Sequence, residues 1–440
     1  MVENILLLAT EMSHHVHGFE WTVKDLFVYP NEFIYWGIQI VMYPYMTGLV
    51  AGAFVLSSLY HVFGQEDLKD MARFSLIFSL ALLPVAMLPL LLHLQQPLRA
   101  LNVTFTPHFT SAIGAFGLIF VTYAIIVLCE IWFVYRVYFV EQTIALKDAS
   151  GFRNRFMRFL YNILTLGAFD RSDAAVRKDK KAVSILAAIG IPVACFLHGY
   201  AGFIFGSVKA NALWMSPLMP IIFIMSAIVS GIALCIFTYI VIIEAKRFST
   251  IIARGKGDKS IEVLKGVEID IVTKASKYLI GFLLAAITLE LLDLIFRGYT
   301  GMKSWEILRS VMYGKDFINI FVLQYGFGNL LPFILLVLPK LTVRRIAFAC
   351  ILVLFGVFMM RWNVVIGGQA FSLSFAGYMH YELPIIPHSI ETYKEGLLGA
   401  LTVIVSPFVL FWVINKITPS LRLEFGKQIA EKESKTTQRT

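Results

Sequence analysis

Residues 182–209 of this 440-residue chain read Ala182-Val-Ser-Ile-Leu-Ala-Ala-Ile-Gly-Ile-Pro-Val-Ala-Cys-Phe-Leu-His198-Gly-Tyr-Ala-Gly-Phe-Ile-Phe-Gly-Ser-Val-Lys209. The segment is apolar and long enough to cross a bilayer as a helix, which needs about 20 such residues. It places the imidazole of His198 about 26 Å along a helix that starts at Lys181. Ionisable groups are rare at membrane depth, because burying them costs several kcal/mol unless they are paired or hydrated. We therefore expect a function for His198 and partners for it elsewhere in the chain.

The composition extends this membrane assignment to the whole chain. Hydrophobic residues make up 58% and charged residues 15%, and the mean hydropathy is +0.74. These values exclude a soluble globular protein and predict a polytopic membrane protein. The formal net charge of +9 is typical of basic cytoplasmic loops, so we expect no nucleic-acid partner.

The apolar pattern predicts an all-α protein with about nine transmembrane helices, within a range of eight to ten. The predicted spans are 34–62, 73–95, 109–138, 182–207, 217–243, 276–296, 317–339, 343–361 and 396–416. We expect two four-helix bundles and one extra helix. The corresponding regions are an outer segment 1–33, a first bundle 34–210, a second bundle 211–365, an outer loop with the last span 366–416, and an inner polar tail 417–440.

Charge in the loops predicts the orientation. Loop 140–181 holds nine Lys and Arg residues and loop 244–277 holds eight, and the positive-inside rule places both in the cytoplasm. The amino terminus is then outside and the carboxyl terminus inside. Residues 150–168 combine phenylalanines with arginines, which favours a helix lying on the membrane surface.

Small residues indicate where helices approach closely. Gly48 and Gly52 form a GxxxG pattern on the first span, Gly202 and Gly206 form another on the fourth, and the fifth span carries a small face at Ser226, Ser230 and Gly231. A repeat of one bundle by the other is compatible with this spacing.

Cysteine and histidine spacing gives no cluster site. Cys129, Cys195, Cys235 and Cys350 stand singly in apolar segments, so we expect neither an iron–sulfur cluster nor a zinc site in this chain. His14, His15 and His17 could bind a metal, but a solvated or partner-contacting segment is the stronger interpretation.

Polar residues at the outer ends of spans one to four suggest a ligand pocket. We expect Tyr35, Gln39, His93, His108 and His198 to converge there. A quinone head group needs hydrogen-bond donors and a group that exchanges protons near neutral pH, as histidine does. The alternative is that His93 and His108 only hydrogen-bond neighbouring loops.

A second set of charges lies deeper in the membrane. Glu130 is expected near the inner face, whereas Glu290, Asp293 and Arg361 are expected at similar depth about 20–24 Å up their helices. We predict an ion pair of Arg361 with Asp293 or Glu290. A structural pair and a proton path are equally compatible with this pattern.

Four motifs together resemble one family. They are Tyr43-Pro-Tyr-Met-Thr-Gly-Leu-Val-Ala-Gly52, His93-Leu-Gln-Gln-Pro-Leu-Arg99, His198 to Gly206 with Lys209-Ala-Asn-Ala-Leu-Trp-Met-Ser-Pro-Leu-Met-Pro220, and Arg361-Trp-Asn-Val-Val-Ile-Gly-Gly-Gln369. The chain is similar over residues 30–415 to the NrfD/PsrC membrane subunits of polysulfide-reductase-type complexes. The last two motifs most resemble the DsrP branch and its relatives in heterodisulfide-reductase-like menaquinol-oxidising complexes. His93 stands where many relatives have Asp in Asp-Leu-Gly-x-Pro.

The resemblance implies a quinone site in the first bundle near the outer face, no haem, and an outer iron–sulfur subunit of ferredoxin type. Arg99 and Lys209 join the candidate quinone-binding residues through their motifs. The implied cofactor is menaquinone as an exchangeable substrate, with no haem or iron–sulfur cluster in this chain, and the implied setting is the plasma membrane of a prokaryote.

The leading hypothesis is a quinone-reactive subunit of an anaerobic respiratory complex, linked by resemblance to sulfite or sulfur respiration and not catalytic alone. Its partners would be the iron–sulfur subunit and other membrane and cytochrome subunits. An ion or proton transporter and a haem b cytochrome, which would need paired histidines such as His93 and His198, are the alternatives.

Overall fold

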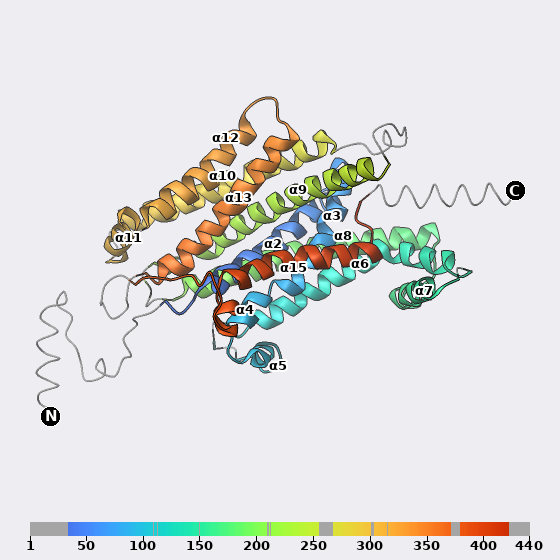
Figure 1. The fold of residues 1–440 in the computed structure, drawn as a ribbon, viewed down its shortest axis with the longest axis horizontal. Coiled ribbons are helices and arrows are strands. Elements are labelled where there is room, and N and C mark those ends of the chain that lie inside the picture. Colours follow the sequence, from blue (N-terminus) through green and yellow to red (C-terminus); the bar gives the residue numbers. More distant parts are fainter. Residues whose placement is uncertain are drawn as a thin grey trace, which may run out of the picture.

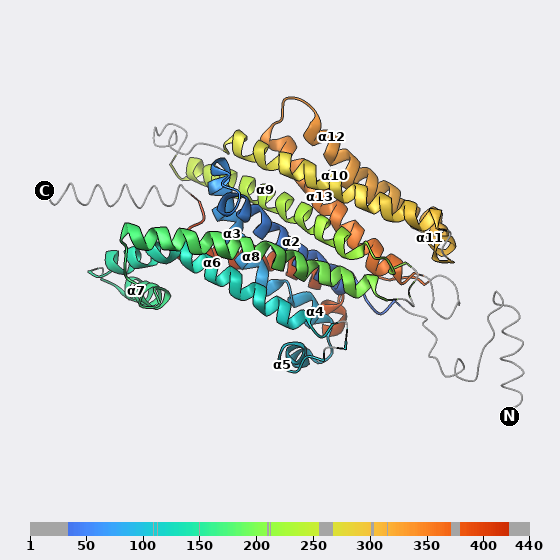
Figure 2. The ribbon, with the colours of Figure 1, turned by 180° about the vertical axis from the view of Figure 1, so that it is seen from behind.

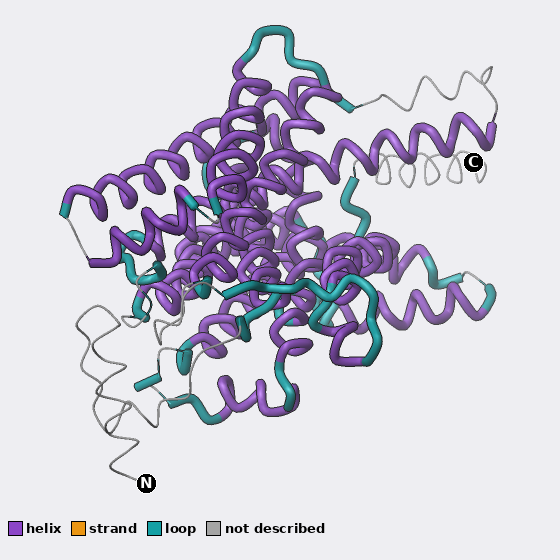
Figure 3. Tube along the Cα trace, turned by 60° about the vertical axis from the view of Figure 1, so that its left-hand side comes forward, coloured by secondary structure: helices purple, strands orange, loops and turns teal. Residues whose placement is uncertain are grey.

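A computed structural model describes residues 34–421 apart from 109, 112, 149, 209–210, 212, 255–266, 301–302, 315 and 371–378. This part of the chain is helical and contains no β-strand (Figure 3). The predicted outer segment 1–33, with its three histidines, and most of the tail 417–440 lie outside the described residues.

Nine helices of the described part are long and apolar enough to cross a membrane, which confirms the predicted all-α fold class. They are α2 (Ile38–His61), α3 (Lys69–Val85) continued by α4 (Leu88–His93), α6 (Phe116–Ala145), α8 (Asp173–Gly206), α9 (Met219–Arg254), α10 (Ile269–Tyr299), the π-helix η5 (Ile318–Leu330) continued by α12 (Leu331–Val337), α13 (Val343–Trp362) continued by the π-helix η6 (Asn363–Gly367), and α15 (Leu397–Ile417).

Short helices cap both ends of the bundle. They are η2 (Glu66–Leu68), η3 (Pro97–Leu101), α5 (Asn102–Phe105), α7 (Phe152–Leu164), α11 (Lys303–Tyr313) and α14 (Ile390–Lys394). Figures 1 and 2 show α4, α5 and α11 toward one end of the long helices and α7 toward the other. We call the first the amino end, because α2 begins there, and the second the basic end, because loop 140–181 lies there.

Several predicted boundaries need correction; the fifth span, for example, ends at Arg254 instead of residue 243. The second span is interrupted after Pro84, and residues 86 and 87 form a turn between α3 and α4. The third span begins at Phe116 instead of residue 109. The fourth begins earlier than predicted, at Asp173, because the Ser172 hydroxyl accepts a hydrogen bond from the Ala175 amide at 3.2 Å and caps the helix.

The helices pack in two groups that meet along α2 and α9. In one group α2, α3, α6 and α8 pack against each other, and in the other α9 packs against α10 and α13. At the junction, a Cβ placed on Gly52 would lie 2.7 Å from the Gly231 Cα and 2.3 Å from the Ala227 carbonyl oxygen. Two glycines therefore allow the two backbones to touch, as the small-residue pattern indicated. The limits of the two predicted bundles as domains stay a prediction.

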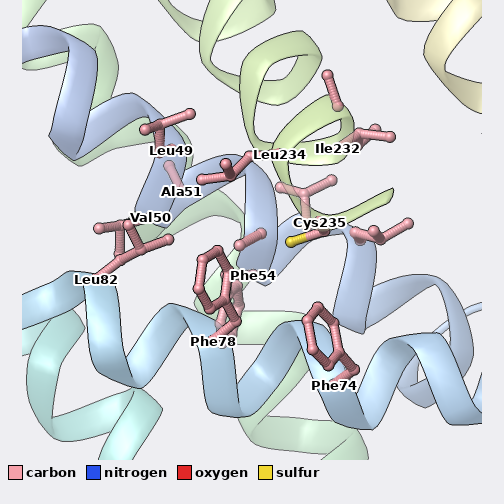
Figure 4. Close-up of a cluster of buried hydrophobic side chains, with 14 of the residues drawn as sticks. Leu49, Val50, Ala51, Phe54, Phe74, Phe78, Leu82, Ile232, Leu234 and Cys235 are labelled. Carbon is pink, nitrogen blue, oxygen red and sulfur yellow. The ribbon is translucent and has the colours of Figure 1, made fainter. Parts of the chain in front are cut away.

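The core where these helices meet is aromatic and aliphatic. Figure 4 shows Phe54 of α2 facing Phe74 and Phe78 of α3, with Leu234 and Cys235 of α9 nearby. The Phe74 and Phe78 rings are stacked with their centroids 5.8 Å apart. Packing of this kind gives the polar side chains described below fixed positions.

The predicted surface helix 150–168 forms as α7. Its Tyr161 packs against α6 and donates a hydrogen bond to the Ile417 carbonyl oxygen at 3.1 Å. On another side of the helix, Phe152, Phe156 and Phe159 are exposed by 85%, 55% and 63%. An apolar face left outside the fold, next to arginines, is what an interfacial helix requires.

Candidate functional site

Two buried residues from different helix groups contact each other at the centre of the molecule. The Arg361 Nη2 of α13 lies 2.9 Å from the His198 Nε2 of α8, and neither side chain is exposed to solvent. A guanidinium group can only donate, so Nε2 accepts and the ring proton is on Nδ1. The Thr47 hydroxyl of α2 lies 3.4 Å from that Nδ1. The predicted partners of His198 are therefore Arg361 and Thr47.

Arg361 is held by uncharged groups. Its Nη2 also donates to the Ser226 hydroxyl at 2.6 Å, and the guanidinium carbon lies 3.8 Å from the centroid of the Phe223 ring. Such a cation–π contact is strongest where water is excluded. The predicted ion pair of Arg361 with Asp293 or Glu290 is wrong, since Arg361 makes no salt bridge with any described residue.

Asp293 has a nearer partner on its own helix. The Arg297 Nε lies 3.0 Å from the Asp293 carboxylate, one turn along α10, and the Ser216 hydroxyl also donates to that carboxylate. The Arg297 Nη1 donates to the Leu213 carbonyl oxygen at 3.3 Å. Because the pair has i, i+4 spacing, the sequence could have shown it.

Glu290 belongs to a second polar chain in the same region. The Gln324 Nε2 donates to the Glu290 carboxylate at 2.9 Å, and the Asn363 Nδ2 donates to the Gln324 Oε1 at 2.8 Å. Gln324 and Asn363 lie on the π-helices η5 and η6, which are rare and often occur at functional positions. Neither residue was predicted from the sequence to have a function.

These side chains line a cavity of about 160 Å³ at the amino end of the second helix group. Asp316 also lines it, and its buried Oδ2 has no hydrogen-bond partner among the described residues. Carboxylates and amides in an otherwise apolar wall would hold a small number of water molecules or protons. The cavity is too small for a quinone with its isoprenoid tail, because ligand pockets usually enclose about 300–1,000 Å³.

The predicted quinone-binding residues divide into separate places. His93 ends α4, and its Nδ1 lies 2.9 Å from the Glu395 Oε1. The Gln39 side chain donates to the carbonyl oxygen of Lys394, the residue before Glu395. Gln39 and His93 therefore meet at the carboxyl end of α14. His198 lies elsewhere, because its contacts on α2 are Thr47 and Gly48, about 12 Å along the helix from Gln39.

The other predicted residues lie at the surface of the amino end. Tyr35 is 57% exposed, and Arg99 on η3 is exposed. His108 is exposed too, and its Nδ1 lies 2.7 Å from the Thr110 hydroxyl. Lys209 lies outside the described residues. The single five-residue pocket is thus replaced by a His93–Glu395 pair, a buried His198–Arg361 pair and three surface residues.

An open groove runs beside the His93–Glu395 pair. It encloses about 770 Å³ between α3, α4 and α15, and its wall is mainly apolar. Leu88 on α4 and Tyr393 on α14 both line it, and they precede His93 and Glu395 by five and two residues. Leu398, Leu401 and Val405, which line the groove from α15, are 40%, 44% and 54% exposed, so an apolar chain could reach the groove from outside the fold.

The motif Arg361–Gln369 also fastens the start of α2. The Gln369 side chain donates to the Trp36 carbonyl oxygen at 3.0 Å and accepts from the Trp36 amide at 3.2 Å. The Trp36 and Trp214 rings stack with centroids 5.1 Å apart. Three segments that are far apart in the chain therefore meet at the amino end, and two of them, with Trp214 and Gln369, belong to the motifs quoted above.

Comparison with known proteins gives the family. The family model described as "Polysulphide reductase, NrfD" matches residues 29–373. The chain belongs to this family. It is also 27% identical to a selenate reductase subunit of Mesobacillus selenatarsenatis, over 75% of this chain and 73% of that protein.

Two further relatives cover similar shares. The chain is 26% identical to a putative dimethyl sulfoxide reductase membrane subunit of Halobacterium salinarum, over 80% of this chain and 71% of that protein. It is 25% identical to the Hdr-like menaquinol oxidoreductase integral membrane subunit of Archaeoglobus fulgidus, over 81% of this chain and 76% of that protein. The resemblance to the NrfD/PsrC family is confirmed, and the chain is a multi-pass membrane protein of an oxidoreductase family.

Proposed function

We propose that this chain is the quinone-reactive membrane subunit of a prokaryotic respiratory complex and that it exchanges electrons between menaquinol or menaquinone and an iron–sulfur subunit of ferredoxin type. The names of three relatives, which are subunits of reductases or of a menaquinol oxidoreductase, support this class. Sulfur-linked, anaerobic respiration in the plasma membrane, with the amino end outside, belongs to the same proposal.

The His93–Glu395 pair beside the apolar groove is the observation that carries the proposal. Glu395 fixes the ring through Nδ1, and no described residue hydrogen-bonds Nε2, so Nε2 can face a ligand hydroxyl or carbonyl. A carboxylate within hydrogen-bonding distance also stabilises the imidazolium that forms when the ring takes a proton. Histidine is the side chain that most often acts as a general acid or base in proteins.

The groove suits the rest of a quinone. Its mainly apolar wall would accept an isoprenoid chain, and it is several times larger than the polar cavity near Glu290. Tyr393 lines the groove, and its hydroxyl lies 2.7 Å from that of Thr402. The site therefore offers a polar end at His93 and an apolar body toward lipid, as quinone sites require.

Quinol chemistry supplies two electrons and two protons in each turnover. His93 accepts one proton at Nε2 while Glu395 stabilises the imidazolium, and water at the amino end takes the other proton. The electrons leave through the iron–sulfur partner, which we place over the amino end. In the direction of quinone reduction, His93 donates the proton instead.

The structure gives less support for a quinone-binding role of the other predicted residues. Gln39 holds the backbone that presents Glu395, which makes it a positioning residue. Quinone-binding roles for Tyr35, Arg99, His108, His198 and Lys209 stay predictions. Both ring nitrogens of His198 are hydrogen-bonded, so a haem held between His93 and His198 has no structural support.

Substitution in the intact complex tests the proposal. We expect His93→Ala to lower the oxidation rate of a water-soluble menaquinol analogue about a hundredfold, a typical contribution of a general base, and Glu395→Gln to lower it less. His388→Asn, which changes an exposed histidine at the same end, should keep the wild-type rate. A quinol-site inhibitor whose fluorescence is quenched on binding should bind more weakly to His93→Ala. Unchanged rate and binding in His93→Ala would place the quinone elsewhere.

A further inference from the structure

A pocket of about 510 Å³ enters the first helix group from the basic end. The pocket is lined by His61 of α2, Val134 and Val137 of α6, and Ser184 of α8, together with charged side chains such as Arg73. The Ser184 hydroxyl donates to the His61 carbonyl oxygen at 2.8 Å. The pocket lies at the opposite end of the molecule from the His93–Glu395 pair and plays no part in the proposed quinone site.

Unsatisfied polar groups lie one helical turn along the chain from residues that line this pocket. Within the described part of the chain, both buried carboxylate oxygens of Glu130 lack a hydrogen-bond partner, and so does the Ser57 hydroxyl. Neither side chain is exposed to solvent, and the buried His61 Nε2 also has no partner among these residues. Buried polar atoms are hydrogen-bonded in the great majority of cases, so these three side chains are places where water or a proton would be held.

The geometry of α2 and α6 places these groups together. The two helices run in the same direction, and the Tyr123 hydroxyl of α6 donates to the Val50 carbonyl oxygen of α2 at 3.5 Å. Seven residues further along each helix, which is nearly two full turns and about 10.5 Å, come Glu130 and Ser57. They therefore lie at similar depth, on the helix faces that carry Val50 and Tyr123.

The next turn of both helices reaches the pocket. His61 follows Ser57 by four residues and Val134 follows Glu130 by four residues, and both line the pocket. Residues four apart lie on one face of a helix. One helical turn thus separates the Glu130 carboxyl group from space that is open to the basic end.

Among the residues that the structure describes, no cation neutralises Glu130. Arg136, which follows it on α6, donates to the Asp179 carboxylate at 2.6 Å and 2.9 Å and to the Ala168 carbonyl oxygen. A charged carboxylate without a partner costs several kcal/mol in an apolar interior. The Glu130 carboxyl group is therefore more stable in its protonated, neutral form, and water in the pocket is the nearest source of that proton.

We propose that Glu130 is a proton-binding site that exchanges protons with the aqueous phase at the basic end through His61 and Ser57. A proton from water passes along these two side chains to the carboxylate and returns by the same route, with no change of oxidation state. On the amino-end side of Ser57 and Glu130 along their helices, the Phe54 and Tyr123 rings make an edge-to-face contact with their centroids 5.6 Å apart.

Infrared spectroscopy of the full chain in lipid nanodiscs tests this proposal without a quinone or a partner subunit. We expect a protonated-carboxyl band in the wild-type chain that is missing from Glu130→Gln and kept in Glu290→Gln. After transfer to deuterium oxide the band should shift within seconds. Absence of the Glu130 band in the wild type would overturn the proposal, because the carboxylate would then be permanently charged.

A reversible plug tests the route. Val134→Cys provides an anchor in the pocket for a bulky disulfide-forming reagent, and the wild-type chain with its four cysteines, treated in the same way, is the control. We expect the plug to slow the deuterium shift of the Glu130 band at least tenfold and a reductant to restore it. An exchange rate that is equal with and without the plug would reject the pocket as the route.

Discussion

The Arg361 guanidinium donates a 2.9 Å hydrogen bond to the His198 ring and joins α13 of the second helix group to α8 of the first. The residues are 163 positions apart in the chain, and the same guanidinium binds Ser226 on α9. One buried cation therefore ties together three helices. Its contacts are neutral, so its stability depends on those hydrogen bonds and on the Phe223 ring.

We expect Arg361→Leu and His198→Ala each to lower the stability of the folded protein by about 1–3 kcal/mol, because each leaves buried hydrogen-bonding atoms without a partner. The double variant should be less destabilised than the sum of the two, since the residues share one interaction. Thermal unfolding in detergent measures all three. Arg344→Leu, at an exposed position on the same helix, is the control. Additive effects would contradict a direct coupling.

The contact between Gly52 and Gly231 should tolerate no side chain. Gly52→Ala would place its Cβ 2.3 Å from the Ala227 carbonyl oxygen, so α2 and α9 would have to separate. We expect a loss of several kcal/mol, as overpacking at a rigid backbone contact predicts. Gly281→Ala is the matched control, since no described atom lies within 4 Å of that Cβ. Equal yields of folded protein for both variants would show that the two helices do not pack as described.

Cross-linking can establish which end meets the partner subunit. We expect a cysteine at Leu98, which is 84% exposed at the amino end, to cross-link to the iron–sulfur subunit in the native complex. A cysteine at the exposed Arg171, at the basic end, should not. A membrane-impermeant maleimide applied to intact cells should label the first and not the second. The reverse pattern would invert the proposed orientation.

The start of α8 should weaken in acid. The backbone amide of Ser172 donates to the Asp170 carboxylate at 2.8 Å, and this hydrogen bond, followed by one from the Ser172 side chain, holds the pKa of Asp170 below its usual value. A lowered folded-state pKa stabilises the protein above the unfolded pKa, and the stabilisation is lost as the pH falls through the folded value. Asp170→Ala should therefore lower the melting temperature slightly at pH 7 and not at a pH below both pKa values. A difference that does not change with pH would mean that the carboxylate has no part.

Local patterns in the chain were enough to predict several features. Nine spans follow from runs of apolar residues, because a bilayer requires every spanning helix to be apolar over about 20 residues. The surface helix α7 follows from phenylalanines spaced three and four apart among arginines. The close contact of α2 with α9 was indicated by glycine and serine spacing. The family follows from four motifs and is confirmed over residues 29–373.

Predictions were wrong where a contact joins residues that are far apart in the sequence, or where a helix is interrupted. The pair of Arg361 with an acidic residue was predicted from equal depth alone, but depth does not say which faces of two helices meet. Asp293 instead pairs with Arg297, one helical turn along α10, and this i, i+4 spacing is visible in the sequence. The turn at residues 86 and 87 was missed because the apolar pattern continues through it.

The sequence by itself determined the helical membrane fold and the number of candidate spans, because hydrophobicity and helical period act locally. Only the tertiary structure decided which polar groups meet. Glu395 lies 302 residues from His93, and Arg361 lies 163 residues from His198. Glu130 has no hydrogen-bond partner in the described part of the chain, and Arg136 on the same helix pairs with Asp179. Each of these outcomes depends on how the spanning helices rotate against one another, and side-chain packing sets that rotation across the whole molecule.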